Sequence, residues 1–359
     1  EYFVNALTGA VIDKYNHNCG AGATTATATD LMGQSKTIHV FQDNIYYLIN
    51  ASKDMYTGSQ NSKPGAGKGT IVTLDFQNGT QQSTSYKDIT TNNNTGWNAT
   101  GVSAHSIANA TYDYFKSTFN RKSFDNKGGD IVSFINVADD DGGGLDNAYW
   151  SGQYMFYGNG RNSFLPLPRG LDVGGHELAH GVTQETAGLE YKDESGALNE
   201  SFSDIFGCMV DRDDWMMGED VVKPGVFAGG ALRNMADPHN GGSSLNDRGW
   251  QPNHMNEKYT GTQDNGGVHI NSGIVNRAFY IIANAIGKEK AEQIYYKALS
   301  QYLTKTSKFI DLRLAVVKAA TDIHGANSTE VNTAKQAFDT VGIFDGSGSG
   351  TPTNLPTNP

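Results

Sequence analysis

His176-Glu177-Leu178-Ala179-His180 places two histidines four residues apart, with a glutamate directly after the first. On an α-helix this spacing corresponds to about 400° of rotation, so both imidazoles leave the same face roughly 6 Å apart. Two nitrogen ligands in that arrangement suit one zinc ion and leave Glu177 beside the metal and its water. The pentapeptide therefore predicts a helix at this point and a hydrolytic metal site that needs a third ligand.

A third zinc ligand can come from two places in the sequence. In one class of zinc enzymes a further histidine follows within the same motif, but Thr183 and Thr186 occupy the corresponding positions here. In another class the ligand is a glutamate on a following helix, and Glu200 is available for that role. Gly188 and Gly196 break the chain before it, so a helix–loop–helix would return Glu200 to the histidines.

Two polar residues near Glu200 are expected to support the ligands from outside. Asp204 lies one helical turn beyond Glu200 and can accept the second ring N–H of His176. Such a carboxylate fixes the tautomer of the histidine and orients its ring. Asn199, the neighbour of Glu200, is assigned to the same supporting set.

Composition and charge limit the class of protein. Hydrophobic residues make up 37% of the chain and aromatic residues 10%, as in a folded protein. The formal net charge of -11 argues against a nucleic-acid partner. No apolar run approaches the roughly 20 residues needed to cross a bilayer. A charged fraction of only 18%, with abundant Gly, Asn, Ser and Thr, is common in exported enzymes, so we expect a secreted protein.

Hydrophobic periodicity divides the chain into a β-rich half followed by an α-helical half. Strands are expected within residues 2–12 (two short ones) and at 37–41, 45–49, 70–76, 131–137 and 153–157, with a hairpin turn at 42–44. Helices are expected, besides the zinc helix, at 102–119, 273–286, 290–303, 311–323 and 330–338. The pattern predicts an α+β fold with the zinc helix where the two halves join.

Several motifs resemble those of one protein family. Residues 172–206 are similar to the thermolysin-like neutral metalloproteases, including the pseudolysin and vibriolysin branch. The likeness runs from about residue 102 to residue 344, through the motifs at 147–150, 260–273 and 335–339, while the residues before 102 match loosely. The resemblance implies a two-lobed architecture, with the active-site cleft between a β-rich amino-terminal lobe and a mostly α-helical carboxy-terminal lobe.

The resemblance also implies a division of the chain. A propeptide remnant is expected at 1–18, the amino-terminal lobe at 19–170, the central zinc-binding helix at 171–187, the carboxy-terminal lobe at 188–344 and a flexible tail at 345–359. Either maturation cleaves at an unusual place or the amino-terminal segment stays attached. The Gly-, Ser- and Pro-containing tail is either a linker to a further module or a frayed terminus.

By the same resemblance, one catalytic zinc ion is bound by His176, His180 and Glu200. Glu177 would polarise the water at the zinc and pass its proton to the leaving amine. Tyr191 and His269 match the family residues that stabilise the oxyanion of the tetrahedral intermediate. Asp264 would hold His269 in its working orientation.

Two further sets of residues match the family's substrate-binding positions. The main chain of the substrate would contact Asn147, the backbone of Ala148, and Arg233. The pocket beyond the scissile bond would be lined by Phe164, Leu167, Val173, Val221 and Leu232. Because these side chains are predominantly apolar, a bulky hydrophobic residue is expected at P1′.

A calcium site is implied near the active centre. Its matching carboxylates are Asp172, Asp211, Asp214 and Glu219. Met216 stands where members with two calcium ions carry a glutamate, and it can offer only its backbone carbonyl, so one calcium ion is expected. Gly230 replaces an acidic residue of a more distant calcium loop, which we expect to be absent.

The leading hypothesis is a zinc-dependent neutral endopeptidase, expected to be monomeric, whose partners are protein or peptide substrates and its own propeptide. One alternative is a zinc aminopeptidase, although no Gly-Ala-Met-Glu-Asn-type anchor for a substrate amine is present. The other is a binding protein or latent proenzyme fragment whose metal site is unused. Cys19 and Cys208 could form a disulfide, or Cys208 could be a small buried apolar residue.

Overall fold

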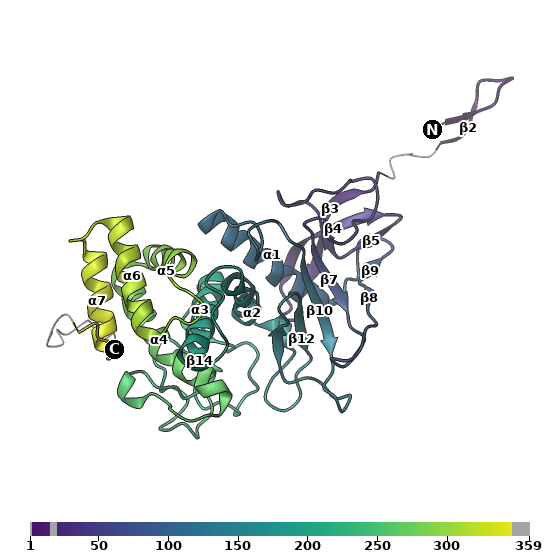
Figure 1. Ribbon diagram of the computed structural model, residues 1–359. Helices are drawn as coiled ribbons and strands as arrows, with labels where there is room; N and C mark the ends of the chain where they lie inside the picture. The colour runs from purple at the N-terminus through teal and green to yellow at the C-terminus, as the bar shows by residue number, and fades with distance from the viewer. Residues whose placement is uncertain (1, 15–19, 347–359) are drawn as a thin grey trace.

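The computed structural model describes residues 2–14 and 20–346 (Figure 1). Strands β3 to β12 and α1 (Ala99–Phe119) lie at one side of the molecule, and α4 to α7, with β14 near α4, lie at the other. Two helices, α2 (Leu171–Gln184) and α3 (Asp193–Asp211), lie between these parts and pack against each other. The active-site helix predicted from the histidine spacing is α2.

The bounds of the other elements are as follows. The strands are β1 Tyr2–Val4, β2 Val11–Lys14, β3 Gly22–Thr29, β4 Ser35–Asp43, β5 Ile45–Tyr47, β6 Ile49–Asn50, β7 Ile71–Asp75, β8 Lys87–Asp88, β9 Thr90–Thr91, β10 Ile131–Val137, β11 Ala148–Trp150, β12 Met155–Gly158, β13 Met216–Met217 and β14 Arg233–Asn234. The helices are η1 Leu167–Arg169, η2 Met255–Glu257, α4 Asp264–Ile286, α5 Lys288–Gln301, α6 Phe309–His324 and α7 Thr329–Thr340.

Two sheets form the amino-terminal part of the described body. The larger sheet has the order β11-β12-β10-β7-β6, with β8 paired to β7, and its strands β12, β10 and β7 are parallel. The second sheet has the order β3-β4-β5-β9 and is antiparallel. α1 packs against strands of both sheets and buries Val102, Ile107, Ala108 and Tyr112. β11 pairs with β12 at the end of the larger sheet and packs against α2.

The carboxy-terminal helices pack around their own hydrophobic core. Its largest fully buried side chains are aromatic: Phe202, Phe206, Phe279, Tyr295, Phe309 and Phe338. Phe279 and Tyr295 meet edge to face, with ring centroids 4.9 Å apart. Such pairs stabilise a core beyond the contribution of their buried area.

Glycines bring α2 and α3 into backbone contact. A Cβ atom added at Gly207 of α3 would lie 2.6 Å from the carbonyl oxygen of Asp172 and 3.2 Å from the amide nitrogen of His176 on α2. A Cβ atom added at Gly175 would lie 3.3 Å from the Cα atom of Gly207. Glycine allows this approach because it has no side chain. The close packing of α3 on α2 brings Glu200 to the two histidines.

The predicted α+β fold is confirmed, with strands in the amino-terminal region and helices in the carboxy-terminal region. The prediction missed β3, whose sequence alternates Ala and Thr and therefore shows little contrast between an apolar and a polar face. It began α1 too late, because Asn98 caps the helix by accepting a hydrogen bond from the amide of Gly101. It also began α4 at residue 273, whereas the assigned span starts at Asp264 and includes a left-handed turn at 264–267.

Two further expectations concern the chain as a whole. Among the described residues, no helix is long and apolar enough to span a membrane. Cys208 is buried as a free thiol that donates to the carbonyl oxygen of Met216 at 3.3 Å. Cys19, its possible disulfide partner, lies outside the described residues.

Candidate active site

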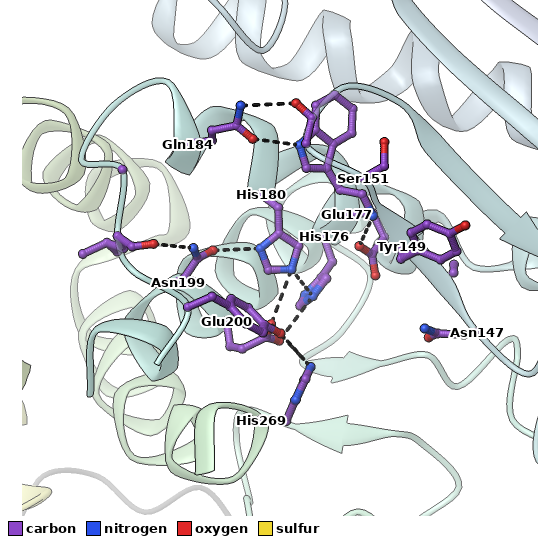
Figure 2. A pocket seen from close by; sticks show the side chains of 16 residues that line it. Asn147, Tyr149, Ser151, His176, Glu177, His180, Gln184, Asn199, Glu200 and His269 are labelled. Carbon is purple, nitrogen blue, oxygen red and sulfur yellow. Dashed lines mark hydrogen bonds and ion pairs between the residues drawn. The ribbon is translucent and has the colours of Figure 1, made fainter. Parts of the chain in front are cut away.

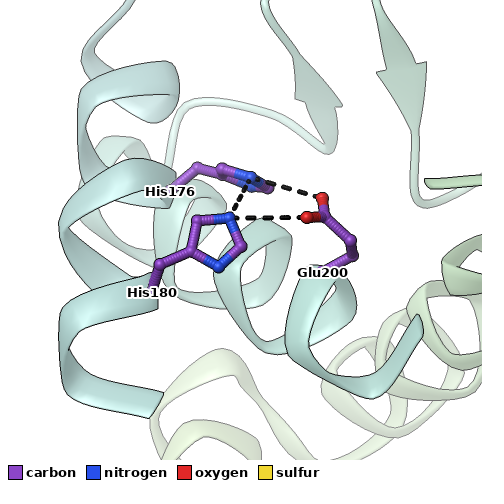
Figure 3. Close-up of side chains that lie close together, drawn as sticks. All are labelled: His176, His180 and Glu200. Atoms are coloured by element: carbon purple, nitrogen blue, oxygen red, sulfur yellow. Dashed lines mark hydrogen bonds and ion pairs between the residues drawn. The ribbon is translucent and has the colours of Figure 1, made fainter. Parts of the chain in front are cut away.

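Three side chains from α2 and α3 converge on one point (Figure 3). The Nε2 atoms of His176 and His180 are 3.1 Å apart, and each is 3.5 Å from an oxygen of Glu200. Glu200 is buried, and its Oε2 has no hydrogen-bond partner within the described ranges. Two imidazole nitrogens and a buried carboxylate that lacks a donor are the ligand set of a catalytic zinc site.

Each histidine is oriented by a second contact through its other ring nitrogen. Nδ1 of His176 lies 2.8 Å from Oδ1 of Asp204. Nδ1 of His180 lies 2.8 Å from Oδ1 of Asn199 and 3.0 Å from Oγ of Ser203. These contacts leave both Nε2 atoms directed at Glu200, which is the arrangement that metal coordination requires. Sequence reasoning singled out Asp204 and Asn199 but missed Ser203, a small residue with no motif of its own.

Asp204 is itself held by a buried network. Arg233 donates to both of its oxygens, with the shortest contact at 2.6 Å, and Asn276 donates to Oδ2 at 2.7 Å. Burial alone would raise the pKa of Asp204, but the charge of Arg233 and the contact with His176 hold that pKa well below its usual range. Arg233, expected to contact the substrate, therefore also anchors the carboxylate that contacts His176.

Glu177 lies on the same helix and is held from the opposite side. The amide of Trp150, the last residue of β11, donates to Oε2 of Glu177 at 3.0 Å. Burial raises the pKa of Glu177 to about 7, and Glu200 adds to that shift while His180 opposes it. The edge strand thus orients the carboxylate that lies beside the candidate metal ligands.

Tyr191 and His269 approach Glu200 from two other segments. The hydroxyl of Tyr191 donates to Oε1 of Glu200 and lies 3.0 Å from Nε2 of His269. His269 is fixed by Asp264, whose carboxylate lies 2.7 Å from Nδ1 and accepts the backbone amide of His269 at 2.8 Å. Burial would lower the pKa of His269, but Asp264 and the charge of Glu200 outweigh it and raise that pKa. Both side chains therefore place hydrogen-bond donors beside Glu200, one of the candidate zinc ligands.

The site opens into two adjoining cavities that share Asn147, Ala148, His176, Glu177 and His269. The first has a volume of about 560 Å³ and extends past Trp150, Gln184 and Tyr191 (Figure 2). The second has a volume of about 310 Å³, and its apolar lining is Phe164, Leu167, Val173, Met217, Val221 and Leu232. Every residue expected in the apolar pocket lies in it, and Met217 is an addition that no sequence signal indicated.

A second acidic group lies near the start of α2. Asp172, Asp211 and Glu219 bring carboxylate oxygens within 4.8 Å of one another. Burial raises the pKa of Asp211 to about 6 and that of Glu219 to about 7, and neighbouring carboxylates add to both shifts. Buried oxygens of Asp172 and Glu219 lack a hydrogen-bond partner within the described residues. The group fits a hard cation such as calcium.

The two other residues expected at the calcium site lie outside this three-residue group. Oδ1 of Asp214 accepts the amide of Met216 at 2.7 Å. The carbonyl oxygen of Met216 accepts the thiol of Cys208. Their role in binding a cation therefore stays a prediction.

Comparison with known families identifies both parts of the chain. Residues 25–184 match the thermolysin metallopeptidase catalytic domain, and residues 187–343 match the thermolysin metallopeptidase alpha-helical domain. The boundary between the two matches falls just after α2, so the candidate ligands His176, His180 and Glu200 come from both domains.

Individual relatives agree with this assignment. The chain is 42% identical over 353 residues to "Bacillolysin" of Brevibacillus brevis, covering 95% of this chain and 61% of the relative. It is 41% identical over 342 residues to "Extracellular elastase" of Staphylococcus epidermidis, covering 95% of this chain and 62% of the relative. Among solved structures, "Precursor of Protealysin, Metalloproteinase from Serratia proteamaculans" matches with a TM-score of 0.69 and 33% identity, covering 78% of this chain and 89% of that one.

Proposed function

The chain belongs to the thermolysin metallopeptidase family, and from this premise we propose that it is a zinc-dependent endopeptidase that hydrolyses internal peptide bonds. The observation that supports the proposal most is the convergence of two imidazole nitrogens and a buried carboxylate, with the side chain of Glu177 lining the same cavity. A zinc ion bound to His176, His180 and Glu200 would polarise the substrate carbonyl and lower the pKa of a water molecule toward about 7.

The chain's own residues supply the proton transfers. Oε1 or Oε2 of Glu177 takes the proton from the attacking water and delivers it to the nitrogen of the leaving amine. Trp150 holds this carboxylate through its backbone amide and so fixes the distance over which the proton moves. The hydroxyl of Tyr191 and Nε2 of His269 donate to the carbonyl oxygen as it gains negative charge.

An open cleft along a strand edge favours an endopeptidase over an aminopeptidase. β11 ends its sheet, and its residues line the first cavity together with Gly152 and Gln184. An extended peptide can bind along such an edge through main-chain hydrogen bonds. Asn147, Ala148 and Arg233 are proposed to contact this main chain, and the chain of the substrate can continue in both directions from the zinc ligands.

The apolar cavity is proposed to bind the residue at P1′. It is lined by large aliphatic and aromatic side chains, so burial of a Leu, Phe, Ile or Val side chain there would contribute about 1.5–3 kcal/mol. Cleavage of a protein mixture should therefore show these residues enriched at P1′. A cleavage profile without that enrichment would refute the assignment of this cavity.

The experiment that tests the function uses an internally quenched peptide with a blocked amino terminus. The wild-type protein should cleave it, a zinc chelator should abolish cleavage, and added zinc should restore it. Glu177→Ala should lose activity by several orders of magnitude, whereas Glu185→Ala, which removes an exposed acid at the end of the same helix, should retain it. Retained cleavage in Glu177→Ala would overturn the mechanism, and cleavage only of peptides with a free amino terminus would favour an aminopeptidase.

Three further proposals follow from the family and the acidic group. One calcium ion is proposed at Asp172, Asp211 and Glu219, with Asp214 and Met216 as neighbouring ligands. The protein is proposed to act outside the cell, as the name of the staphylococcal relative says of that protein. A propeptide is proposed to precede the mature enzyme, because the structural neighbour is a precursor form; amino-terminal sequencing of the active protein would test this division.

A further inference from the structure

Gln251 binds the backbone of His269 through its side chain. Its side-chain Nε2 donates to the carbonyl oxygen of His269 at 2.6 Å and to Oγ of Ser272 at 2.9 Å. The side chain is 3% exposed, so water does not compete for these bonds. The carbonyl oxygen of His269 can only accept, which fixes the amide group with its NH₂ toward α4.

The backbone before His269 cannot position this residue by regular helical bonding. Asp264, Asn265, Gly266 and Gly267 have φ angles of 53°, 49°, 89° and 82°, all in the left-handed region. Regular right-handed helix begins only after this turn. The position of the His269 backbone therefore depends on side-chain contacts. Asp264 accepts the amide of His269 at 2.8 Å, and the carbonyl oxygen of His269 accepts from Gln251 at 2.6 Å and from Oγ of Ser272 at 3.2 Å.

The segment that carries Gln251 is itself anchored at several points. The amide of Gln251 donates to the carbonyl oxygen of Pro238 at 2.7 Å. Asn240 donates through its side chain to the carbonyl oxygen of Gly229 at 2.9 Å. Arg248 donates to Oγ of Ser163 in the amino-terminal part of the fold at 2.9 Å. Gln251 thus projects from a fixed segment and not from a free loop.

Close packing removes the remaining freedom between this segment and α4. A Cβ atom added at Gly273 would lie 2.5 Å from the Cβ atom of Gln251 and 2.7 Å from the carbonyl oxygen of Pro252. The segment is therefore in direct contact with α4 at Gly273. A shift of the His269 backbone would have to displace the anchored segment as well.

We propose that Gln251 is a positioning residue for His269, which acts through the His269 carbonyl group to hold Nε2 at the site of the developing oxyanion. The inference rests on the proposed function, because it assigns His269 to the transition state. A side chain that stabilises an oxyanion must be placed before the reaction begins, and a displacement of about 1 Å can reduce the rate by up to about 100-fold. Loss of Gln251 should thus act on the chemical step and not on substrate binding.

The test compares two variants of Gln251 with a matched control. Gln251→Met and Gln251→Glu keep the size of the side chain but remove its donor. Gln293→Met, in α5, removes an exposed side-chain amide that donates to the carbonyl oxygen of Thr118 and has no contact with His269. For each protein we would measure kcat and KM on the quenched peptide, the fraction of active sites, the thermal midpoint and the affinity for a peptide phosphonamidate that mimics the tetrahedral intermediate.

Both Gln251 variants should lower kcat per active site by about tenfold, with KM within about twofold of wild type. Affinity for the phosphonamidate should fall by the same factor as kcat/KM, because both report on the transition state. Gln293→Met should leave all of these values unchanged. Wild-type kcat per active site in Gln251→Met and Gln251→Glu, or an equal loss in Gln293→Met, would overturn the inference. An inactive wild-type protein would refute the proposed function and this role together.

Discussion

The polar residues that hold the candidate zinc ligands in place include several that the motif at residues 176–180 does not predict. Spacing alone pointed to His176, His180 and Glu200, and helical periodicity pointed to Asp204. The other partners of Asp204, Arg233 and Asn276, come from segments far along the chain. Their buried bonds hold Asp204 charged, and a charged Asp204 holds the ring of His176.

Asn199→Ala is predicted to weaken zinc binding by roughly 10- to 100-fold, because His180 would lose the acceptor at its Nδ1 atom. Ser203 alone would remain beside that nitrogen. Zinc affinity can be measured by competition with a chromophoric chelator. Glu185→Ala serves as the control and should bind zinc like the wild type. Equal affinities for Asn199→Ala and wild type would show that the contact does not support the ligand.

At the scale of elements, the left-handed turn at the start of α4 differs most from the structure predicted for this segment. The periodicity of apolar residues placed the helix from residue 273 and gave no indication of the left-handed turn at 264–267. Left-handed backbone costs non-glycine residues about 1–2 kcal/mol each, and Asp264 and Asn265 both adopt it. Asp264 accepts two bonds from His269, which shows what this strained turn positions.

Gly207→Ala is predicted to destabilise the fold by about 1–3 kcal/mol, because the added Cβ would force α2 and α3 apart. The displacement would also move Glu200 from the histidines, so zinc affinity should fall together with stability. Urea unfolding and zinc competition would measure the two effects. Gly65→Ala is a suitable control, since a Cβ atom there meets nothing within 4 Å. A Gly207→Ala protein with wild-type stability would contradict the packing argument.

His105 of α1 contacts both sheets. Its buried ring is expected to make the stability of the fold depend on pH. Its ring nitrogens lie 3.0 Å from Oγ1 of Thr73 on β7 and 2.9 Å from the carbonyl oxygen of His39 on β4. Complete burial lowers the pKa of His105 from 6.5 to about 4. Unfolded chains therefore bind a proton that the folded protein excludes, so stability is retained above pH 6.5 and falls as the pH drops toward 4.

The predicted loss from His105 is on the order of 3 kcal/mol of unfolding free energy between neutral pH and pH 4. Urea titrations at several pH values would compare wild type with His105→Gln, which should show a smaller loss over that range. His324→Gln, in the other half of the molecule, should keep the wild-type dependence. If the wild-type and His105→Gln curves run parallel, His105 does not contribute to the acid sensitivity.

On the scale of the whole molecule, the candidate calcium group brings together α2, α3 and the segment after β13. Asp172 begins α2, Asp211 ends α3, and Glu219 follows β13. Mutual repulsion among these buried carboxylates opposes folding unless a cation neutralises them. A calcium ion bound there would therefore stabilise the packing of α2 on α3, on which the candidate zinc ligands depend.

Calcium is predicted to raise stability by about 2.7 kcal/mol when its free concentration is 100 times the dissociation constant. The measurement is the thermal midpoint of zinc-loaded protein as calcium is added after removal by a calcium-selective chelator. Asp211→Asn should reduce the calcium-dependent rise, whereas Asp213→Asn, at a residue outside the group, should not. A thermal midpoint that does not depend on calcium would exclude the site.

By itself, the sequence determined the local features: the helix that carries two histidines on one face, the glutamate available as third ligand, and the order of strands and helices. These follow from periodicity and residue type, which act over a few positions. Only the tertiary structure decided which distant segments meet, because contacts such as Gln251 with His269, Arg233 with Asp204 and Trp150 with Glu177 arise from packing across the chain. The close approach of α2 and α3 at their glycines also had to come from the tertiary structure. Glycine adds nothing to the hydrophobic periodicity from which the sequence was interpreted.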